Sequence, residues 1–218
     1  MQFLSRLVLA AALLVATLSA QAALQARPGG MVYDTVQNIT WLQNWNTNGL
    51  MNWATANTWA NNLVHGGFDD WRLPTTNTTA SSNCDRSQSA GGGFPQEYLG
   101  FNCTGSEMGH MFYNEFGASR EQSIRAGSNT ANLALFTNVQ SFVYWSSTGY
   151  APSSGSAWDF HTYNGWQGAG DVNGAVYAVA VRPGDVPAIP EPQTYALLLA
   201  GLGAVVVAVR RRWRWRPR

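Results

Sequence analysis

The chain has 218 residues, 45% of them hydrophobic, and a formal net charge of +1 without any lysine. Six of its 13 arginines lie in residues 210–218 and one lies near the N-terminus, which leaves six arginines against 12 acidic residues in the rest of the chain. This central part therefore carries a net charge of about −6. It lacks the basic surface that nucleic acids require, so we expect no nucleic-acid partner.

The first 22 residues have the pattern of a secretory signal peptide. Arg6 precedes an apolar run, residues 7–18, and Ala20-Gln21-Ala22 forms a small-residue cleavage site. We therefore expect export across the inner membrane and a mature N-terminus at Ala23. Residues 23–185 are long enough to form one domain with a single core.

The composition of this domain favours many turns and short, aromatic-rich strands over long amphipathic helices. Charged residues make up only 11% of the chain, which contains 22 glycines and 10 tryptophans. Eight of the tryptophans lie in the domain. We expect most of them to fill the core rather than to stack on ligands.

The first elements predicted in the domain are two short strands, residues 31–34 and 39–42, about a turn at 36–38. The hydrophobic period then changes from two to about 3.6 residues. Residues 50–64 are therefore predicted to form a helix. The two glycines that begin at Gly66 are expected to end this helix.

The second half is predicted to contain one helix and several strands. The helix covers residues 107–116, with Ser106 as its N-cap. The strands cover residues 142–148, 157–163 and 176–182. Asn164-Gly165 follows the second of them and is a strong signal for a two-residue hairpin turn.

The only two cysteines, Cys84 and Cys103, are 19 residues apart. An exported protein is oxidised outside the cytoplasm, so we expect them to form a disulfide. Catalysis or metal binding by these cysteines is the alternative, but the chain has no Cys-x-x-Cys and no Cys/His cluster to favour it.

Four common catalytic and nucleotide-binding motifs are missing from the sequence. The patterns G-x-S-x-G, H-E-x-x-H, the Walker loop and G-x-G-x-x-G are all absent, and His65, His110 and His161 are scattered. Asp159 and His161 share one face of a predicted strand, where we expect a solvent-facing polar pair rather than a catalytic dyad. We therefore expect a non-enzymatic protein that needs no cofactor and no metal.

The end of the chain combines a proline-rich linker, residues 186–193, with an apolar stretch and an arginine block. The linker contains Pro190-Glu191-Pro192, the apolar stretch begins at Thr194, and the block begins with Arg210, Arg211 and Arg212. This tail, residues 186–218, resembles the PEP-CTERM sorting signal of Gram-negative bacteria. The resemblance implies that residues 194–218 form a transmembrane sorting helix and an arginine-rich tail. It also implies a membrane-anchored precursor and processing by an exosortase that delivers the protein to the surface or the medium. An ordinary tail anchor is the alternative.

The domain itself resembles a bacterial family that includes the C-terminal domain of the Legionella collagen-like adhesin. The resemblance rests on four short motifs in order along the chain. They contain Asp70, Trp71, Arg72, Leu73 and Pro74, then Trp145, Ser146 and Ser147, then Trp158, and finally Arg182. It implies an α+β fold of the C-type-lectin-like or sulfatase-modifying-factor-like kind, with small twisted antiparallel sheets and two helices.

The adhesin domain is associated with glycosaminoglycans, which a domain of net charge about −6 would repel. We therefore expect a neutral exopolysaccharide or a surface protein as the ligand. A purely structural matrix protein of the biofilm and an enzyme of unrecognised type are the alternatives. Arg72, beside Asp69 and Asp70, is expected to hold its loop by bidentate pairing with a carboxylate. Ligand binding is the alternative role for Arg72. For Arg182 we expect the same structural role.

Overall fold

The computed structural model describes residues 23–89 and 91–186. The predicted signal peptide, the motif Pro190-Glu191-Pro192, the sorting helix and its arginine block lie outside the described residues. Within the described ranges, no helix is long and apolar enough to cross a membrane.

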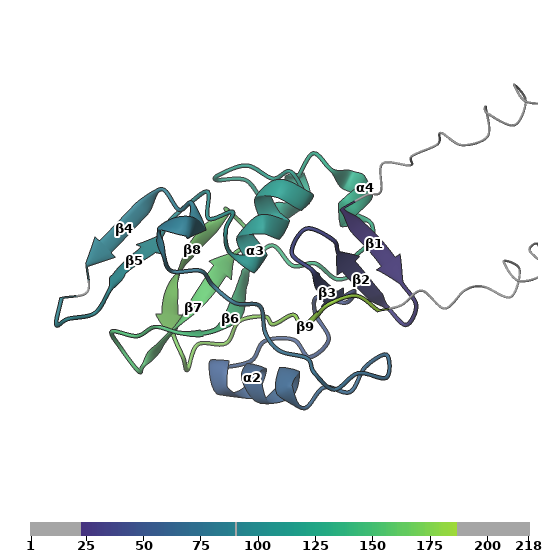
Figure 1. Cartoon of the computed structure of the whole chain (residues 1–218), viewed down its shortest axis with the longest axis horizontal. Coiled ribbons are helices and arrows are strands. Elements are labelled where there is room, and N and C mark those ends of the chain that lie inside the picture. The colour runs from purple at the N-terminus through teal and green to yellow at the C-terminus, as the bar shows by residue number, and fades with distance from the viewer. Residues whose placement is uncertain (1–22, 90, 187–218) are drawn as a thin grey trace, which may run out of the picture.

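The domain has an α+β fold with three small antiparallel sheets (Figure 1). The first sheet has the order β1-β2-β3-β9, formed by Leu24–Arg27, Met31–Asp34, Ile39–Leu42 and Val181–Pro183. The second sheet has the order β6-β7-β8, formed by Val143–Gly149, Ser156–His161 and Trp166–Asp171. A separate hairpin pairs β4 (Arg86–Ser89) with β5 (Gln96–Leu99).

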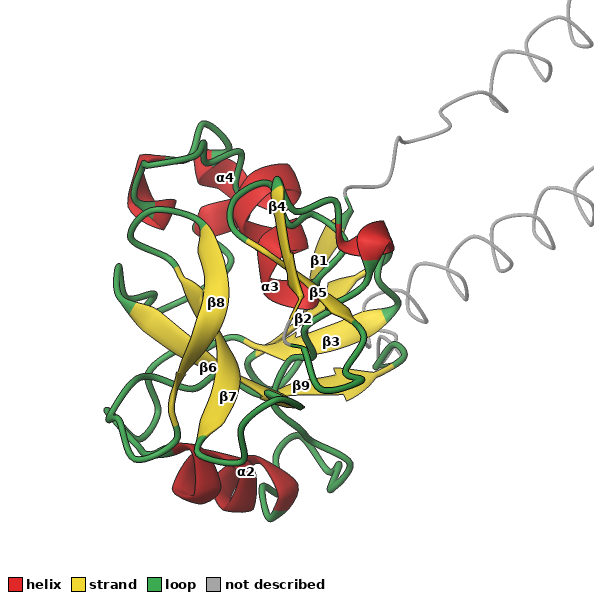
Figure 2. Cartoon of the chain, turned by 90° about the vertical axis from the view of Figure 1, so that its left-hand side faces the viewer, coloured by secondary structure: helices red, strands yellow, loops and turns green. Residues whose placement is uncertain are grey.

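The helices are short and lie on opposite sides of the two larger sheets (Figure 2). On one side lies α2 (Trp53–Asn61), and on the other lies α3 (Glu107–His110), which continues as the π-helical segment η2 (Met111–Glu115). The remaining helical turns are η1 (Ala80–Ser82), η3 (Ile124–Ala126) and α4 (Thr130–Leu133).

Strands β2 and β3 have the predicted bounds, but the predicted helix 50–64 is shorter than expected. It begins after Asn52, whose side chain accepts a hydrogen bond from the backbone N–H of Thr55. It cannot begin earlier because Met51 forms a β-bridge with Val176 instead.

The two-residue turn predicted at Asn164-Gly165 is wrong. His161 pairs with Trp166, so a four-residue loop joins β7 to β8 and the strand ends at His161 rather than at residue 163. Thr162 explains the difference, because its backbone N–H donates to the carbonyl of Phe142 and its hydroxyl donates to that of Gln140. These bonds tie Thr162 to the beginning of β6.

The predicted strand 176–182 is also shorter, with only Val181–Pro183 in the first sheet. Residues before it form single bridges to two different parts of the chain, since Val176 pairs with Met51, just before α2, and Tyr177 pairs with Tyr144 in β6. This segment therefore runs between the two sheets and connects them.

An aromatic cluster fills the core between these layers. Trp45 is fully buried and contacts four other rings at centroid distances of 5.4–5.7 Å: Trp41, Phe116, Phe136 and Tyr144. As expected, most tryptophans of the domain are buried; these are Trp41, Trp45, Trp71, Trp145 and Trp158.

Candidate functional site

A groove of about 290 Å³ lies between the β4–β5 hairpin and the β6-β7-β8 sheet. Its lining is aromatic, aliphatic and uncharged: Gln88, Leu99, Tyr150, Ser156, Trp158, Trp166, Gly168 and Ala169. Its exposed surface is polar and apolar in similar measure, and a hollow that combines aromatic side chains with a few polar groups is a candidate ligand site. We call this hollow the hairpin groove.

Strands β7 and β8 supply the sheet side of the hairpin groove. Trp158 on β7 is opposite Ala169 on β8, and its buried ring packs edge-to-face on Tyr150 at 5.7 Å. Trp166 begins β8 and is half-buried. Gly168 is required beside it, because a β-carbon there would lie 2.6 Å from Nε1 of Trp166.

The hairpin supplies the opposite wall. Gln88 on β4 donates a hydrogen bond of 2.8 Å to the hydroxyl of Tyr150. The guanidinium of Arg86 lies 5.1 Å from the centre of the Trp166 ring, within cation–π range. The hairpin therefore contacts both half-buried aromatic residues of the hairpin groove.

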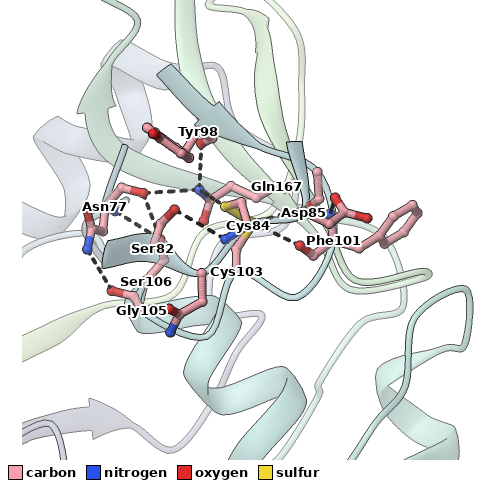
Figure 3. The surroundings of a disulfide bond; sticks show 12 residues. Asn77, Ser82, Cys84, Asp85, Tyr98, Phe101, Cys103, Gly105, Ser106 and Gln167 are labelled. Atoms are coloured by element: carbon pink, nitrogen blue, oxygen red, sulfur yellow. Dashed lines mark hydrogen bonds between the residues drawn. A yellow bond between two sulfur atoms is a disulfide. The ribbon is translucent and has the colours of Figure 1, made fainter. Parts of the chain in front are cut away.

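A disulfide closes the base of the hairpin. Cys84 and Cys103 are bonded to each other, as the sequence predicted, and they flank β4 and β5 in the chain (Figure 3). Gln167 lies beside the disulfide, is 1% exposed, and its Nε2 points toward Cys84 and the carbonyl of Tyr98. Backbone bonds between Gly100 and Gln167 join β5 to β8. The position of the hairpin is thus fixed covalently and by hydrogen bonds.

A second hollow, of about 550 Å³, follows the outer face of α2. It is wide and shallow, and Trp59 is its one aromatic side chain, beside Leu63 and the exposed Val64. It offers fewer aromatic contacts than the hairpin groove.

The Asp-Trp-Arg-Leu-Pro motif lies outside the hairpin groove. Trp71 and Leu73 are buried in the core. Arg72 forms a bidentate ion pair with Glu107 at the start of α3, with distances of 2.7 and 2.8 Å, and also donates to the carbonyl of Leu73. Glu107 also accepts a bond of 2.7 Å from the backbone N–H of Thr75. Arg72 therefore joins this loop to α3 through Glu107, not through the neighbouring Asp69 or Asp70.

Asp70 pairs with Arg182 instead. The guanidinium of Arg182 donates to both carboxylate oxygens, at 2.7 and 3.0 Å, and lies over the ring of Phe68 at 3.8 Å. These hydrogen bonds lower the pKa of Asp70. Arg27 lowers the pKa of Asp185 in the same way.

The remaining motif residues also have structural contacts. Trp145 is buried and its Nε1 donates to the carbonyl of Met51, while the backbone N–H of Ser147 donates to that of Pro74. Ser146 is buried, and its carbonyl accepts from Nε1 of Trp53. Of the motif residues, Trp158 alone lines the hairpin groove.

The prediction that Asp159 and His161 form a solvent-facing pair is wrong for Asp159, which is 5% exposed. Gly170 on the neighbouring strand leaves space for this carboxylate, since a β-carbon there would lie 2.7 Å from Oδ2 of Asp159. His161 Nε2 lies 3.2 Å from Oδ1 of Asp159, and its ring stacks on Tyr163.

Away from the hairpin groove, one group of side chains among the described residues has donor atoms suited to a metal ion. Asp34, His110 and Glu115 are all buried and each offers one ligand atom within 4.8 Å of the others. They connect β2 to the α3–η2 segment and contribute nothing to the hairpin groove lining.

Comparison with known families gives two matches. The family described as Lcl C-terminal domain matches residues 30–182, which include strands β2 to β8, the first two residues of β9, the disulfide and the hairpin groove. The chain belongs to this family. Outside the Lcl domain, residues 188–212 match the PEP-CTERM protein-sorting motif, so the protein is exported, begins as a membrane-anchored precursor and is processed by an exosortase. No curated protein and no solved structure matches the chain.

Arg72 in the Lcl domain gives a test of its structural role. Replacement by alanine is expected to cost about 1–2 kcal/mol of unfolding free energy, because a partly exposed bidentate pair and a bond to a backbone carbonyl are lost. Lysine cannot make the bidentate contact, so Arg72→Lys should lie between the parent and Arg72→Ala in melting temperature. Arg120→Ala, at a more exposed ion pair, is the matched control and should melt within a degree or two of the parent. Unchanged melting of Arg72→Ala would instead favour a ligand-binding role.

The lowered pKa values of Asp70 and Asp185 predict acid sensitivity. A carboxylate with a lowered folded pKa stabilises the fold fully above its unfolded pKa of about 3.9, and this contribution disappears as the pH falls through the lower folded pKa. We expect the melting temperature to fall below about pH 4, measured by circular dichroism. Asp70→Asn should make this decline shallower, and an equally steep decline would contradict the assignment.

Proposed function

We propose that the protein is a surface or extracellular-matrix component whose Lcl domain is lectin-like and binds a neutral glycan in the hairpin groove without catalysing a reaction. The observation that carries this proposal is the lining of the groove, which combines Tyr150, Trp158 and Trp166 with the neutral polar side chains of Gln88 and Ser156. The small antiparallel sheets and short helices support the lectin-like architecture.

The chemistry of the groove suits a sugar. One face of many sugar rings carries C–H groups that pack on aromatic side chains, while the hydroxyl groups need hydrogen-bond partners. The half-buried Tyr150 and Trp166 can supply the aromatic contact, and Gln88 and Ser156 can supply donors and acceptors. No carboxylate or basic group lines the groove itself, so a charged ligand has no partner there.

The charge of the whole domain supports a neutral ligand as well. Its net charge of about −6 disfavours sulfated or otherwise anionic polysaccharides through repulsion at ordinary salt. Arg86 is next to the groove, but its guanidinium already lies over Trp166.

The test is binding of neutral and anionic oligosaccharides to the exported protein on a glycan array, followed by calorimetry with any positive neutral glycan. Tyr150→Ala and Trp166→Ala are expected to weaken binding at least about tenfold, or ~1.4 kcal/mol. Trp59→Ala, in the shallow hollow on α2, is the matched control and should bind like the parent.

The other outcomes discriminate between functions. Loss of binding in Trp59→Ala alone would move the site to α2. Absence of binding to any glycan would favour a purely structural matrix protein without a ligand. Turnover of a bound oligosaccharide would overturn the non-enzymatic assignment.

The role of the arginine block in sorting can be tested separately. Replacing Arg210, Arg211 and Arg212 with serine is expected to leave uncut precursor in the membrane, because the arginine block and Pro190-Glu191-Pro192 are proposed to be recognised together. Immunoblots of membrane and medium fractions measure this. Mature protein of normal size in its normal location would show that the block is not needed.

A further inference from the structure

Three buried side chains from separate segments converge beside the first sheet. Asp34 ends β2, His110 ends α3 and Glu115 ends η2. Nε2 of His110 lies 3.1 Å from Oε1 of Glu115 and 3.8 Å from Oδ2 of Asp34. Their relative exposures are 0% for Asp34, 8% for His110 and 6% for Glu115. An imidazole nitrogen thus faces two carboxylate oxygens in a site shielded from solvent.

The π-helical geometry of η2 explains why His110 and Glu115 face each other. Residues five apart point about 140° away from each other in an α-helix with 3.6 residues per turn. The wider turn closes a bond from the N–H of Phe116 to the carbonyl of Met111, five residues earlier, and brings such side chains nearer to one face. Single π-helical turns occur frequently at functional sites.

Amide groups orient both carboxylates from outside the cluster. Oδ1 of Asp34 accepts from the backbone N–H groups of Val36 and Gln37, and Nε2 of Gln37 donates to Oδ2 at 2.8 Å. Oε2 of Glu115 accepts from Nδ2 of Asn132 at 3.1 Å, which leaves Oε1 directed at His110. Amide and carboxylate partners of this kind hold the ligands of metal sites in place.

The charge of the cluster requires compensation. Two carboxylates are buried together, and neither has an arginine partner in the parts of the chain that the structure describes. The chain has no lysine. A protonated His110 would balance only one negative charge, whereas a divalent cation balances both. Buried carboxylates in proteins are paired with cations or coordinate metal ions.

We propose that Asp34, His110 and Glu115 bind one divalent transition-metal ion, with Zn²⁺ as the best fit. Zn²⁺ accepts a mixed set of imidazole and carboxylate ligands at about 2.0–2.2 Å, which places tetrahedral ligand atoms roughly 3.3–3.6 Å apart. The distances of 3.1 and 3.8 Å from Nε2 of His110 to the two carboxylate oxygens bracket that range. Calcium is disfavoured because it takes six to eight oxygen ligands.

The site joins parts of the chain that are far apart in sequence. A metal ion there links the end of β2 to the α3–η2 segment, which supplies Phe116 to the aromatic core and Glu107 to Arg72. Binding therefore stabilises the domain and is separate from ligand binding in the hairpin groove.

The test is calorimetric titration of ZnCl₂ into the untagged exported protein after treatment with EDTA. We expect one Zn²⁺ to bind per chain. The melting temperature of the protein should be higher with Zn²⁺ present, since an ion that binds only the folded state stabilises that state. Glu115→Gln and Asp34→Asn should bind Zn²⁺ at least tenfold more weakly. Asn132→Ala, which removes the amide behind Glu115, should weaken binding about 10- to 100-fold.

Two variants serve as controls. Asp171→Asn alters an exposed aspartate that accepts from the backbone N–H two residues ahead, as Asp34 does, and should bind Zn²⁺ like the parent. His161→Asn removes the imidazole beside Asp159 and should also leave binding unchanged.

The proposal is overturned if the parent binds no Zn²⁺, if Glu115→Gln retains parental affinity, or if His161→Asn abolishes binding. Should the cluster variants fail to fold, Co²⁺ added to the EDTA-treated parent provides an independent readout. The visible absorption of a tetrahedral Co²⁺ site is expected, and a spectrum identical to that of hexaaqua Co²⁺ would refute the site.

Discussion

Replacing Trp45 with alanine is expected to lower the unfolding free energy by about 3–5 kcal/mol, a large share of the stability of a domain of this size. Trp45 is fully buried and contacts Trp41, Phe116, Phe136 and Tyr144. Its Nε1 has no hydrogen-bond partner within the described residues, so the whole loss comes from packing and from the cavity left behind. Denaturant unfolding measures the difference.

Phe94→Ala is the matched control for this substitution. Phe94 is 43% exposed in the loop between β4 and β5, so its removal should change stability by less than about 0.5 kcal/mol. If Trp45→Ala and Phe94→Ala unfolded at the same denaturant concentration, the aromatic cluster would not be the main core of the domain.

Cys84→Ser is expected to be the second large change. The disulfide closes a segment with a sequence separation of 19 residues, and its loss costs about 3 kcal/mol in the chain-entropy account. For a domain of this size, that corresponds to a melting temperature about 6–12 °C lower. The parent should also show no free thiol before reduction, because the chain contains no other cysteine.

Reduction of the parent supplies the control. The reduced parent should melt close to Cys84→Ser, and reduction of the variant should change its melting no further. Two titratable thiols in the native exported protein would contradict the disulfide. Since Cys84 and Cys103 flank the hairpin, the proposed glycan binding is expected to weaken together with the melting temperature.

Local patterns in the sequence predicted several elements well. Strands β2 and β3 could be predicted with their bounds because two short runs rich in β-branched and aromatic residues flank a turn with Asn38 at a φ of 53°, a conformation that asparagine tolerates. The disulfide followed from compartment and from the presence of only two cysteines.

Contacts between distant segments were not predictable in the same way. A bidentate carboxylate partner was expected for Arg72, but Glu107 lies 35 residues away and the nearer Asp70 is taken by Arg182. The bounds of the last strand and of the β7–β8 loop depend on Met51 and Thr162, whose partners are distant in the sequence.

The hairpin groove was missed for a related reason. Strand β4 is polar and exposed, and β5 combines the exposed Gln96 and the buried Glu97 with half-buried Tyr98 and Leu99, so neither segment has a clear strand pattern in the sequence. The packing of this hairpin against Tyr150 and Trp166 is visible only in three dimensions. His110 and Glu115 were likewise separated by a spacing that an α-helix would not bring together.

The pairing of β9 with β3 sets the order in which the exported chain can mature. Thr40 donates to the carbonyl of Gly184, 144 residues later, so the first sheet is completed only after nearly the whole domain has left the membrane. Val186, which is 7% exposed, lies only four residues before Pro190. A cut that removed β9 would leave the edge of β3 open to pairing with other chains, so the domain requires processing to occur after Val186.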